Sequence, residues 1–395
     1  MATADVAIQP VSARLVRDLA SLIAIPSVNP FDQAPTDGHS EEDVADFLLS
    51  RLQELGFETE RREVAHRRPN VWGKLRGKGD GPSVMLVAHL DTVGVDGYQA
   101  PFEPVVRNGR VHGRGACDMK AAIACFLEVA ELLRAHGIEL AGDLIIAGLC
   151  DEEHVQIGSA DMGRNGPKAD YGIVGEPTEL AICPSHKGQL GVTFKTFGKA
   201  VHSSGPENGV NAVEHMGQVI AAFSTYNAEL QLEAPHPLCG NGRFSMNVVN
   251  GGQIVSAVPD MCTLEVDRRF LPGENTEEII AGYNARLAEL RKSHPDLAYE
   301  VSEPFLQVDP LDISVDSPLV VEMKVAVSNV LASEAQIRAF PGGTDGPNLD
   351  FPCVICGPGS LKQAHSVDEY VEIDQMEKAT AIYLNAILAL TDTAW

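Results

Sequence analysis

The chain has 395 residues, of which 44% are hydrophobic and 22% charged, a composition typical of a globular protein with two or three domains. Thirty Lys and Arg residues stand against 55 Asp and Glu residues, and the formal net charge of -25 opposes nucleic acid and anionic membranes as partners. The N-terminus lacks the basic and apolar segments of a signal peptide, and no run of ~18 or more apolar residues is present, so we expect a cytoplasmic protein.

The first half of the chain alternates helices with apolar strands. Residues 39–57 carry apolar side chains at helical spacing, with acids in the first turn and an N-cap predicted at Ser40. A strand ending in MLVAHLDTV, a helix over about 120–136 and strands near 143–153 and 170–178 follow. Apolar strands separated by helices indicate an α/β sheet, and such sheets place their sites where the strands end.

From about Ser185 the order of elements becomes β-α-β-β-α-β, the split pattern of a ferredoxin-like unit. Its predicted helices cover about 210–230 and 274–292. Helices over 316–332 and 370–390 then surround the strand-like segment 352–359. We therefore predict a helix-flanked, mostly parallel α/β domain made from residues 1–184 and 304–395, with a ferredoxin-like domain of residues 185–303 inserted into it.

Polar side chains gather at the predicted strand ends. His89 and Asp91 are two residues apart, so both would project to the same side if the strand continues through them. Taken singly, each of the others is more often a solvated surface group than a functional one: Asp118, Glu152, Glu153, Glu176 and His365. Together these residues offer two imidazoles and several carboxylates, which suits a pair of ions such as zinc, cobalt or manganese.

The eight cysteines are scattered through apolar segments, which favours buried thiols over a disulfide framework. Cys353 and Cys356 form one CxxC pair inside a strand-like segment. A lone pair of this kind is a weak metal or redox signal, so we favour a position in the core.

Eight segments resemble, in chain order, the motifs of the dinuclear zinc amidohydrolases that include acetylornithine deacetylase, succinyl-diaminopimelate desuccinylase, aminoacylases and glutamate carboxypeptidases. The segments are AHLDTV, PFEPVVRNGRVHGRGACDMK, DEE, GEPT, HKG…AVHSSGPENGVNAVEHM, DRRFLPGE, GGTDG and GPGSLKQAHSVDEYVEI. The resemblance covers nearly the whole chain and is greatest to the acetylornithine deacetylase branch.

This resemblance implies a metal centre. His89 and Glu176 would hold one ion, Glu153 and His365 the other, and Asp118 would bridge them. Zinc is the expected metal, with cobalt or manganese as alternatives. The peptide bond after Asp118 would be cis.

The implied reaction is the hydrolysis of a linear amide. The ions would lower the pKa of a shared water toward about 7. Glu152 would take the proton from this water as general base and deliver it to the leaving amine. Because neighbouring residues in extended chain point apart, Glu153 could bind metal while Glu152 faces substrate. Asp91 would hydrogen-bond the far nitrogen of His89 and fix its tautomer.

The inserted domain and the glycine loops would complete the site. His202 matches a family histidine that reaches into the site of the partner subunit of a homodimer. Arg269 matches an arginine that binds the substrate carboxylate, with Arg268 as a competitor for that role. Backbone amides of the GGTDG loop, at Gly343 and Thr344, and of the GPGS loop at 357–360 could also reach substrate.

The sequence therefore predicts a metal-dependent deacylase acting on an N-acyl amino acid, with acetylornithine as the leading substrate. Alternatives with the same chemistry are a desuccinylase, a general aminoacylase and a dipeptide or glutamate carboxypeptidase. A metal-holding binding protein without turnover is the alternative from another class, and the presence of Glu152 argues against it. Ser256 or Ala257 stands where relatives carry an asparagine, and His154 where they carry a small residue, which puts the acyl group and side-chain preference in doubt.

Overall fold

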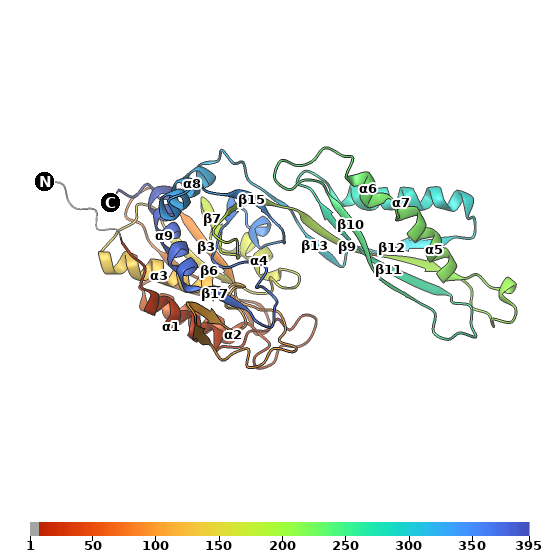
Figure 1. Ribbon diagram of the computed structural model, residues 1–395, viewed down its shortest axis with the longest axis horizontal. Coiled ribbons are helices and arrows are strands. Elements are labelled where there is room, and N and C mark those ends of the chain that lie inside the picture. Colours follow the sequence, from red (N-terminus) through yellow and green to blue (C-terminus); the bar gives the residue numbers. More distant parts are fainter. Residues whose placement is uncertain (1–7, 395) are drawn as a thin grey trace. The chain divides into compact units, whose positions relative to one another are not determined.

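The computed structural model of the protein describes residues 8–394, which form two compact units (Figure 1). Unit 1 contains the chain up to Pro184, Ile313–Phe340 and the chain from Thr344 onward; unit 2 contains Ser185–Asp312 and Pro341–Gly343. The second unit therefore ends later than the predicted residue 303. The reason is that β13 (Leu306–Val308) pairs with β9 (Gly188–Phe197), the central strand of unit 2.

Unit 1 is built on a mixed sheet. Four strands at its centre run parallel, and the strands beside them are antiparallel. In spatial order these strands are β1 (Glu58–Ala65), β2 (Arg68–Leu75), β6 (Leu144–Leu149), β3 (Val84–His89), β7 (Tyr171–Val174), β16 (Cys353–Ile355) and β8 (Ile182–His186), with β15 (Ile337–Phe340) also paired to β8. The predicted α/β class with a parallel sheet at its centre is confirmed.

One apolar core joins this sheet to its helices. Side chains from β3 and β6 share a buried cluster with residues of five helices. These are α1 (Ser12–Ile23), α2 (Glu42–Glu54), α3 (Lys120–His136), α8 (Pro318–Leu331) and α9 (Ile373–Leu390). α3 begins and ends where the sequence predicted. α2 begins later than predicted, with Glu41 and not Ser40 at its N-cap.

The carboxyl ends of the parallel strands bring distant parts of the chain to one edge of the sheet. β3 ends at His89, so Asp91 lies beyond the strand and not within it. The chain turns after β6 into α4 (Ile157–Asn165), and Glu176 follows β7 by two residues. β17 (Tyr370–Glu372), β5 (Arg110–His112) and β4 (Val105–Arg107) form a small sheet. It pairs the segment that follows His365 with the segment that precedes Asp118.

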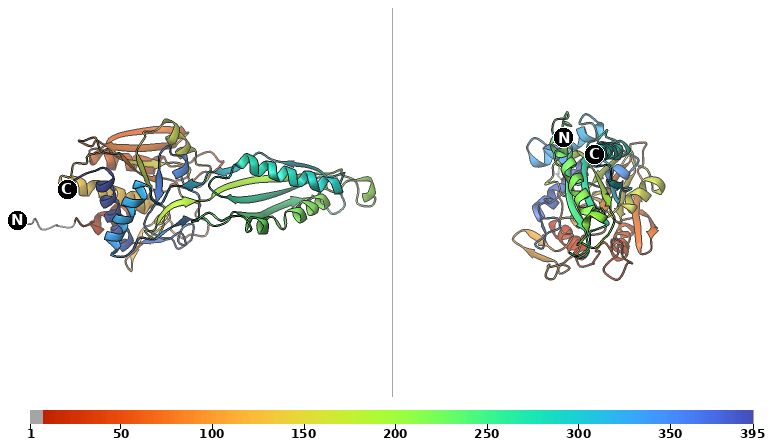
Figure 2. Two further views of the ribbon diagram at one scale, coloured as in Figure 1. Left: turned by 90° about the horizontal axis from the view of Figure 1, so that it is seen from above. Right: turned by 90° about the vertical axis from the view of Figure 1, so that its right-hand side faces the viewer.

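Unit 2 has the predicted ferredoxin-like order of elements. Its strands lie in the order β10 (Arg243–Gly251), β11 (Met261–Phe270), β9 and β12 (Ala298–Val301), and the short β14 (Leu311–Asp312) pairs with the end of β8. The helices α5 (Ala212–Phe223) and α7 (Thr276–Ser293) run along this sheet (Figure 2) and share one apolar core with it. The predicted helix over 210–230 is two helices, because a second one, α6 (Tyr226–Leu230), follows α5 after a break at 224–225.

Within residues 8–394, no helix is both long and apolar enough to cross a membrane.

Candidate metal centre

Asp118 lies between the two predicted histidine ligands. Its Oδ1 is 3.1 Å from Nε2 of His89, and its Oδ2 is 3.3 Å from Nε2 of His365. Asp118 and His89 are buried, whereas the His365 side chain is 55% exposed. A carboxylate that presents one oxygen to each of two imidazoles has the geometry expected of a bridging ligand.

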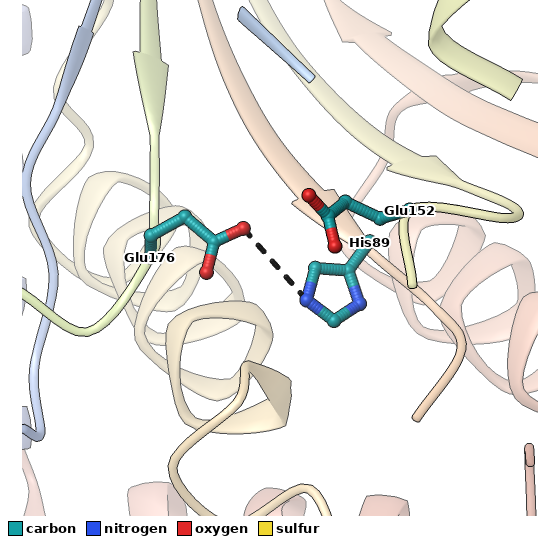
Figure 3. Close-up of side chains that lie close together, drawn as sticks. All are labelled: His89, Glu152 and Glu176. Carbon is teal, nitrogen blue, oxygen red and sulfur yellow. Dashed lines mark ion pairs between the residues drawn. The ribbon is translucent and has the colours of Figure 1, made fainter. Parts of the chain in front are cut away.

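Each histidine also faces a glutamate. Nε2 of His89 is 3.8 Å from Oε1 of Glu176 (Figure 3), and Nε2 of His365 is 3.1 Å from Oε2 of Glu153. The fold therefore brings all five predicted ligands together from four loops and one strand end. His365 has a φ of +61°, which is uncommon for a residue with a side chain and is found at functional sites more often than elsewhere.

Glu152 faces the same cluster. One oxygen or nitrogen atom from each of His89, Glu152 and Glu176 lies within 4.8 Å of the others (Figure 3). The same holds for His89, Asp118 and Glu153. Glu152 and Glu153 do not lie in extended chain, so this part of the prediction is wrong. Residues 152–155 form a turn after Asp151, whose φ is +70°, and it is this turn that directs the two carboxylates into different groups.

The carboxylates crowd one another. Burial, and then the charge of Glu176, raises the pKa of Glu152 well above its ordinary value; burial, and then the charge of Asp118, does the same for Glu176. Hydrogen bonds to Asp118 and Glu153 raise the pKa of His365 to about 10. Glu153 Oε1 is buried and has no hydrogen-bond partner among the described residues. A buried group of like charges with an unpartnered oxygen fits divalent cations.

Asp91 holds the turn that carries the two glutamates. Its carboxylate accepts hydrogen bonds from the backbone amides of Glu152 at 3.1 Å and Glu153 at 3.0 Å, and from Nδ2 of Asn29 at 2.7 Å. Nδ1 of His89 is 3.5 Å from the Asp91 carboxylate but only 3.0 Å from its backbone carbonyl. The predicted orientation of His89 by Asp91 therefore involves the carbonyl oxygen as the nearer acceptor.

A buried ion-pair network behind Asp91 was not predicted. The guanidinium of Arg68 pairs with Glu41 and, at 2.8 Å, with Asp151. Nδ2 of Asn29 donates to Asp151 at 3.1 Å as well as to Asp91. These residues come from distant segments and form no sequence motif, so only the fold shows that they support the turn.

Glu369 organises the loop that ends at Asp118. Its Oε1 accepts from the amides of Cys117 at 2.8 Å and Asp118 at 3.0 Å, and its Oε2 accepts from the amide of Gly115 at 3.0 Å and from Nη1 of Arg114 at 2.6 Å. Glu369 is fully buried. It lies in the quoted VDEY segment, but nothing in that pattern distinguishes it from a surface acid.

Asp345, inside the GGTDG loop, is a further acid beside the cluster. It is 1% exposed, and its Oδ1 has no hydrogen-bond partner among the described residues. Burial raises its pKa to about 7, although a hydrogen bond with Ser159 opposes this rise. Thr344 is fully buried, and its Oγ1 accepts from the amide of Gly346 at 3.3 Å.

The amides of the GPGS loop are occupied by the protein itself. Gly357 donates to Oγ1 of Thr178 at 3.0 Å, and Gly359 donates to Oε1 of Gln375 at 2.8 Å. The suggestion that these two amides reach substrate is therefore wrong. A Cβ on Gly357 would lie 2.1 Å from the carbonyl oxygen of Gly175, so glycine allows this loop to pack against the segment that carries Glu176.

The two arginines of unit 2 have different environments. Arg268 is 1% exposed and its guanidinium pairs with Glu274, so it is a structural residue. The side chain of Arg269 is 31% exposed and pairs with Asp267 at 3.0 Å. Of the two, Arg269 is the one that solvent and small molecules can reach.

His202 also belongs to unit 2. Its Nδ1 is 2.8 Å from Oγ of Ser204, and the residue bridges to Ala257 on a neighbouring loop. The amide of Ser203 donates to the carbonyl of Ser256 at 2.9 Å. Ser256 and Ala257, one of which stands where relatives carry an asparagine, therefore both contact the His202 segment.

Two further expectations are confirmed. The Asp118-Met119 peptide bond is cis. All eight cysteines are buried and free, Cys353 and Cys356 included, and the clusters of possible metal ligands found among residues 8–394 contain no cysteine.

Comparison with known proteins identifies the family of this chain. The model of peptidase family M20/M25/M40 matches residues 85–389. The chain belongs to this family. It is therefore a hydrolase of a metal-dependent family, and the resemblance on which the site residues were named is confirmed.

Two relatives of this M20 protein span most of its length. The N-formyl-4-amino-5-aminomethyl-2-methylpyrimidine deformylase of Bacillus subtilis is 31% identical over 88% of this chain and 89% of the relative. The acetylornithine deacetylase of Vibrio atlanticus is 29% identical over 93% of this chain and 96% of the relative.

Solved structures show the same fold. Aminopeptidase PepT from Bacillus cereus matches with a TM-score of 0.80 at 19% identity, over 96% of this chain and 99% of that chain. A tripeptidase from Staphylococcus aureus matches with a TM-score of 0.79 at 21% identity, over 97% and 100%. The YXEP protein of B. subtilis, described as a dinuclear metal-binding peptidase, matches with a TM-score of 0.67 at 17% identity, over 97% and 99%.

Proposed function

We propose that this M20 hydrolase is a dinuclear metal enzyme that cleaves the amide bond of an N-acyl amino acid, with N-acetyl-L-ornithine as the first candidate substrate. One observation carries the proposal. Asp118 presents its two oxygens to His89 and His365, and each histidine faces its own glutamate, with a further glutamate, Glu152, beside the cluster.

The proposed ligand sets follow from these contacts. One divalent ion would be held by His89, Asp118 and Glu176, and the other by Asp118, Glu153 and His365. Histidine nitrogen and carboxylate oxygen are ligands that zinc accepts, and cobalt and manganese accept them too. When bound, such ions lower the pKa of a water molecule and polarise a carbonyl oxygen.

The protein supplies the proton transfers and the orientation. Glu152 accepts the proton of the attacking water and delivers it to the leaving amine, which is general base and then general acid catalysis. Asp91 keeps Glu152 and Glu153 in position through their backbone amides.

Residues outside the cluster would bind substrate. Arg269 offers a planar fork to the carboxylate of an amino acid, and Gly343 and Thr344 would contact the acyl group or the backbone of the substrate. His202 would reach the site of the partner subunit in a homodimer formed through unit 2, and stabilise the negative oxygen of the tetrahedral intermediate. The same chemistry would serve a desuccinylase, an aminoacylase or a dipeptidase.

The relative that is a deformylase favours a second candidate, an N-formyl amide on an aminomethylpyrimidine. That substrate carries no carboxylate, so Arg269 discriminates between the two candidates. With acetylornithine, Arg269→Ala should raise KM about 10-fold or more, since a charge-assisted hydrogen bond is lost. With the formamide, the same substitution should change KM little.

The test is amine release by protein loaded with zinc or cobalt, from N-acetyl-L-ornithine, N-succinyl-diaminopimelate, several N-acetyl amino acids, dipeptides and the N-formyl aminomethylpyrimidine. Turnover of acetylornithine above the others supports the proposal. Turnover of another amide keeps the mechanism and corrects the substrate. No turnover of any of these amides, with two ions bound, would contradict the proposed function.

A further inference from the structure

We propose that Gln156 is a positioning residue for Glu152, and that Asn348 fixes Gln156 in the orientation this requires. The inference rests on the proposed function, in which Glu152 is the general base. It concerns a chain of hydrogen bonds that leads away from the metal ligands and into α4 and the turn η2 (Gly346–Asn348).

The first link joins the two side chains. Nε2 of Gln156 donates to Oε1 of Glu152 at 3.2 Å. Gln156 is 5% exposed, so solvent does not compete strongly for this bond. The bond occupies one oxygen of Glu152 and leaves Oε2 as the oxygen that can accept a proton from water.

The backbone of Gln156 is held in an uncommon conformation. Its φ is +59°, in the left-handed region, and its amide donates to the carbonyl of Asp151 at 2.8 Å across the turn that carries both glutamates. Left-handed backbone is unfavourable for a residue with a side chain and persists where the surroundings enforce it. This conformation places the Gln156 side chain beside Glu152, at the N-terminus of α4.

The second link determines which way the Gln156 amide points. Nδ2 of Asn348 donates to Oε1 of Gln156 at 3.2 Å and to Oγ of Ser159 at 2.9 Å. An amide nitrogen can only donate, so the atom of Gln156 that faces Asn348 must be the oxygen. The nitrogen of Gln156 is then directed at Glu152.

Ser159 fixes the orientation of Asn348 in turn. The hydroxyl of Ser159 donates to the carbonyl of Gln156 at 3.3 Å. Because its proton is used in this bond, its oxygen accepts from Nδ2 of Asn348. The polarity of the whole chain is thus determined, from Ser159 through Asn348 and Gln156 to Glu152.

Close packing keeps the two ends of this chain at a fixed separation. A Cβ on Gly163 of α4 would lie 1.9 Å from the carbonyl oxygen of Asn348, and one on Gly158 would lie 2.2 Å from the carbonyl oxygen of Cys150. α4 therefore packs directly against η2 and against the end of β6. Because η2 follows Thr344 and Asp345 directly, these two residues lie next to the hydrogen-bonded chain that leads to the proposed base.

The test compares kcat, KM and bound metal for Gln156→Met and Asn348→Leu, using the amide that the wild-type protein hydrolyses fastest. Methionine resembles glutamine in length but cannot donate. Since hydrogen bonds to charged groups are the stronger ones, Gln156→Met should lower kcat by about 10- to 100-fold while KM and metal content stay within about 2-fold. Asn348→Leu should act in the same direction, and the double variant should be no worse than Gln156→Met.

Asn165→Leu is the matched control. It removes a hydrogen bond of 2.6 Å to Asp161 from the same helix without touching the chain to Glu152, and should leave kcat near the wild-type value. If Gln156→Met does not fold, the kcat, KM and bound metal of Asn348→Leu alone test the inference.

Glu152→Gln separates the two proposals. If this variant is inactive while Gln156→Met and Asn348→Leu keep the wild-type kcat, the inference is wrong and the proposed function stands. If Glu152→Gln is fully active, Glu152 is not the general base, and the inference fails while amide hydrolysis itself stands. If the wild-type protein hydrolyses none of the amides, the proposed function fails. A loss of metal equal to the loss of kcat in Gln156→Met would also overturn the inference, because Gln156 would then support the metal ligands.

Discussion

The position of Glu152 would suit either a metal ligand or a general base. Glu152 lies close enough to His89 and Glu176 to serve as a ligand. The two proposed ligand sets, which are His89, Asp118 and Glu176 for one ion and Asp118, Glu153 and His365 for the other, do not need it. If Glu152 binds metal, removing its charge should lower the metal content, whereas if it is the general base only kcat should fall. The substitution Glu152→Gln therefore distinguishes the two roles.

Glu152→Gln should leave two metal ions per chain and lower kcat by ~100-fold or more, since general base catalysis contributes about that much. The measurements are metal content by atomic emission and steady-state turnover of the preferred amide. A variant that binds only one ion would show that Glu152 is a ligand. A variant with normal turnover would remove it from catalysis altogether.

Asp345 allows a prediction on pH and stability. Burial raises its pKa to about 7, so the folded protein binds a proton there more readily than the unfolded chain does. The stability that this provides is present below about pH 4 and is lost as the pH rises to 7. Asp345→Asn, which imitates the protonated form, should therefore stabilise the metal-free protein at pH 8 by ~1–4 kcal/mol.

The measurement is urea unfolding of protein treated with a chelator, at pH 8 and pH 5. The increase in the free energy of unfolding caused by Asp345→Asn should be smaller at pH 5 than at pH 8. Asp350→Asn is the control, because the Asp350 side chain is 81% exposed and pairs with Lys168 at the surface. An equal gain for Asp345→Asn at both pH values would contradict the assignment.

At the scale of elements, the Asp118 loop depends on Glu369, the residue immediately before β17. Four donors converge on this carboxylate, two of them the amides of Cys117 and Asp118. Glu369→Gln would turn one acceptor oxygen into an amide group that faces these donors. Metal affinity should fall by about 10- to 100-fold, which is the usual effect of removing support behind a ligand.

Competition with a chromophoric chelator measures this affinity. Glu372→Gln, at the other end of β17 and half-exposed beside Arg110, should leave it unchanged. Equal affinities for the Glu369 and Glu372 variants would show that the loop keeps Asp118 in place without Glu369.

The elements with a clear local pattern were predicted well, and those that depend on tertiary contacts were not. The bounds of α3 follow from its apolar run and its Gly137 end, which has a φ of +63°. The turn after β6 depends on hydrogen bonds from the backbone amides of Glu152 and Glu153 to the Asp91 carboxylate. The local sequence does not reveal these contacts. The candidate ligands could be singled out by their positions at predicted strand ends, but their assignment to the two ions came only from the family motifs. Glu369 lies within a quoted motif, but the motif does not show that its carboxylate is buried behind Asp118.

At the scale of the whole molecule, the open question for catalysis is the number of chains in an active unit. In unit 2, β10 is an edge strand that pairs only with β11 among the described strands. Val248 and Val249 on this strand are 43% and 56% exposed, and Met261 on β11 is 51% exposed. An apolar sheet edge of this kind supports the proposed homodimer, since edge strands left open tend to pair with another chain.

Complementation between inactive variants tests both the dimer and the proposed role of His202. His202→Ala and Glu152→Gln, co-expressed with different tags, should each be inactive alone. In a mixed dimer, the site with an intact Glu152 on the His202→Ala chain would receive His202 from the partner. Random pairing makes half of the dimers mixed, each with one working site, so about a quarter of wild-type activity should return. If His202 acted within its own chain, every site would still lack one residue and no activity would return. The chain that carries both substitutions, paired with His202→Ala, is the control that should stay inactive under either arrangement.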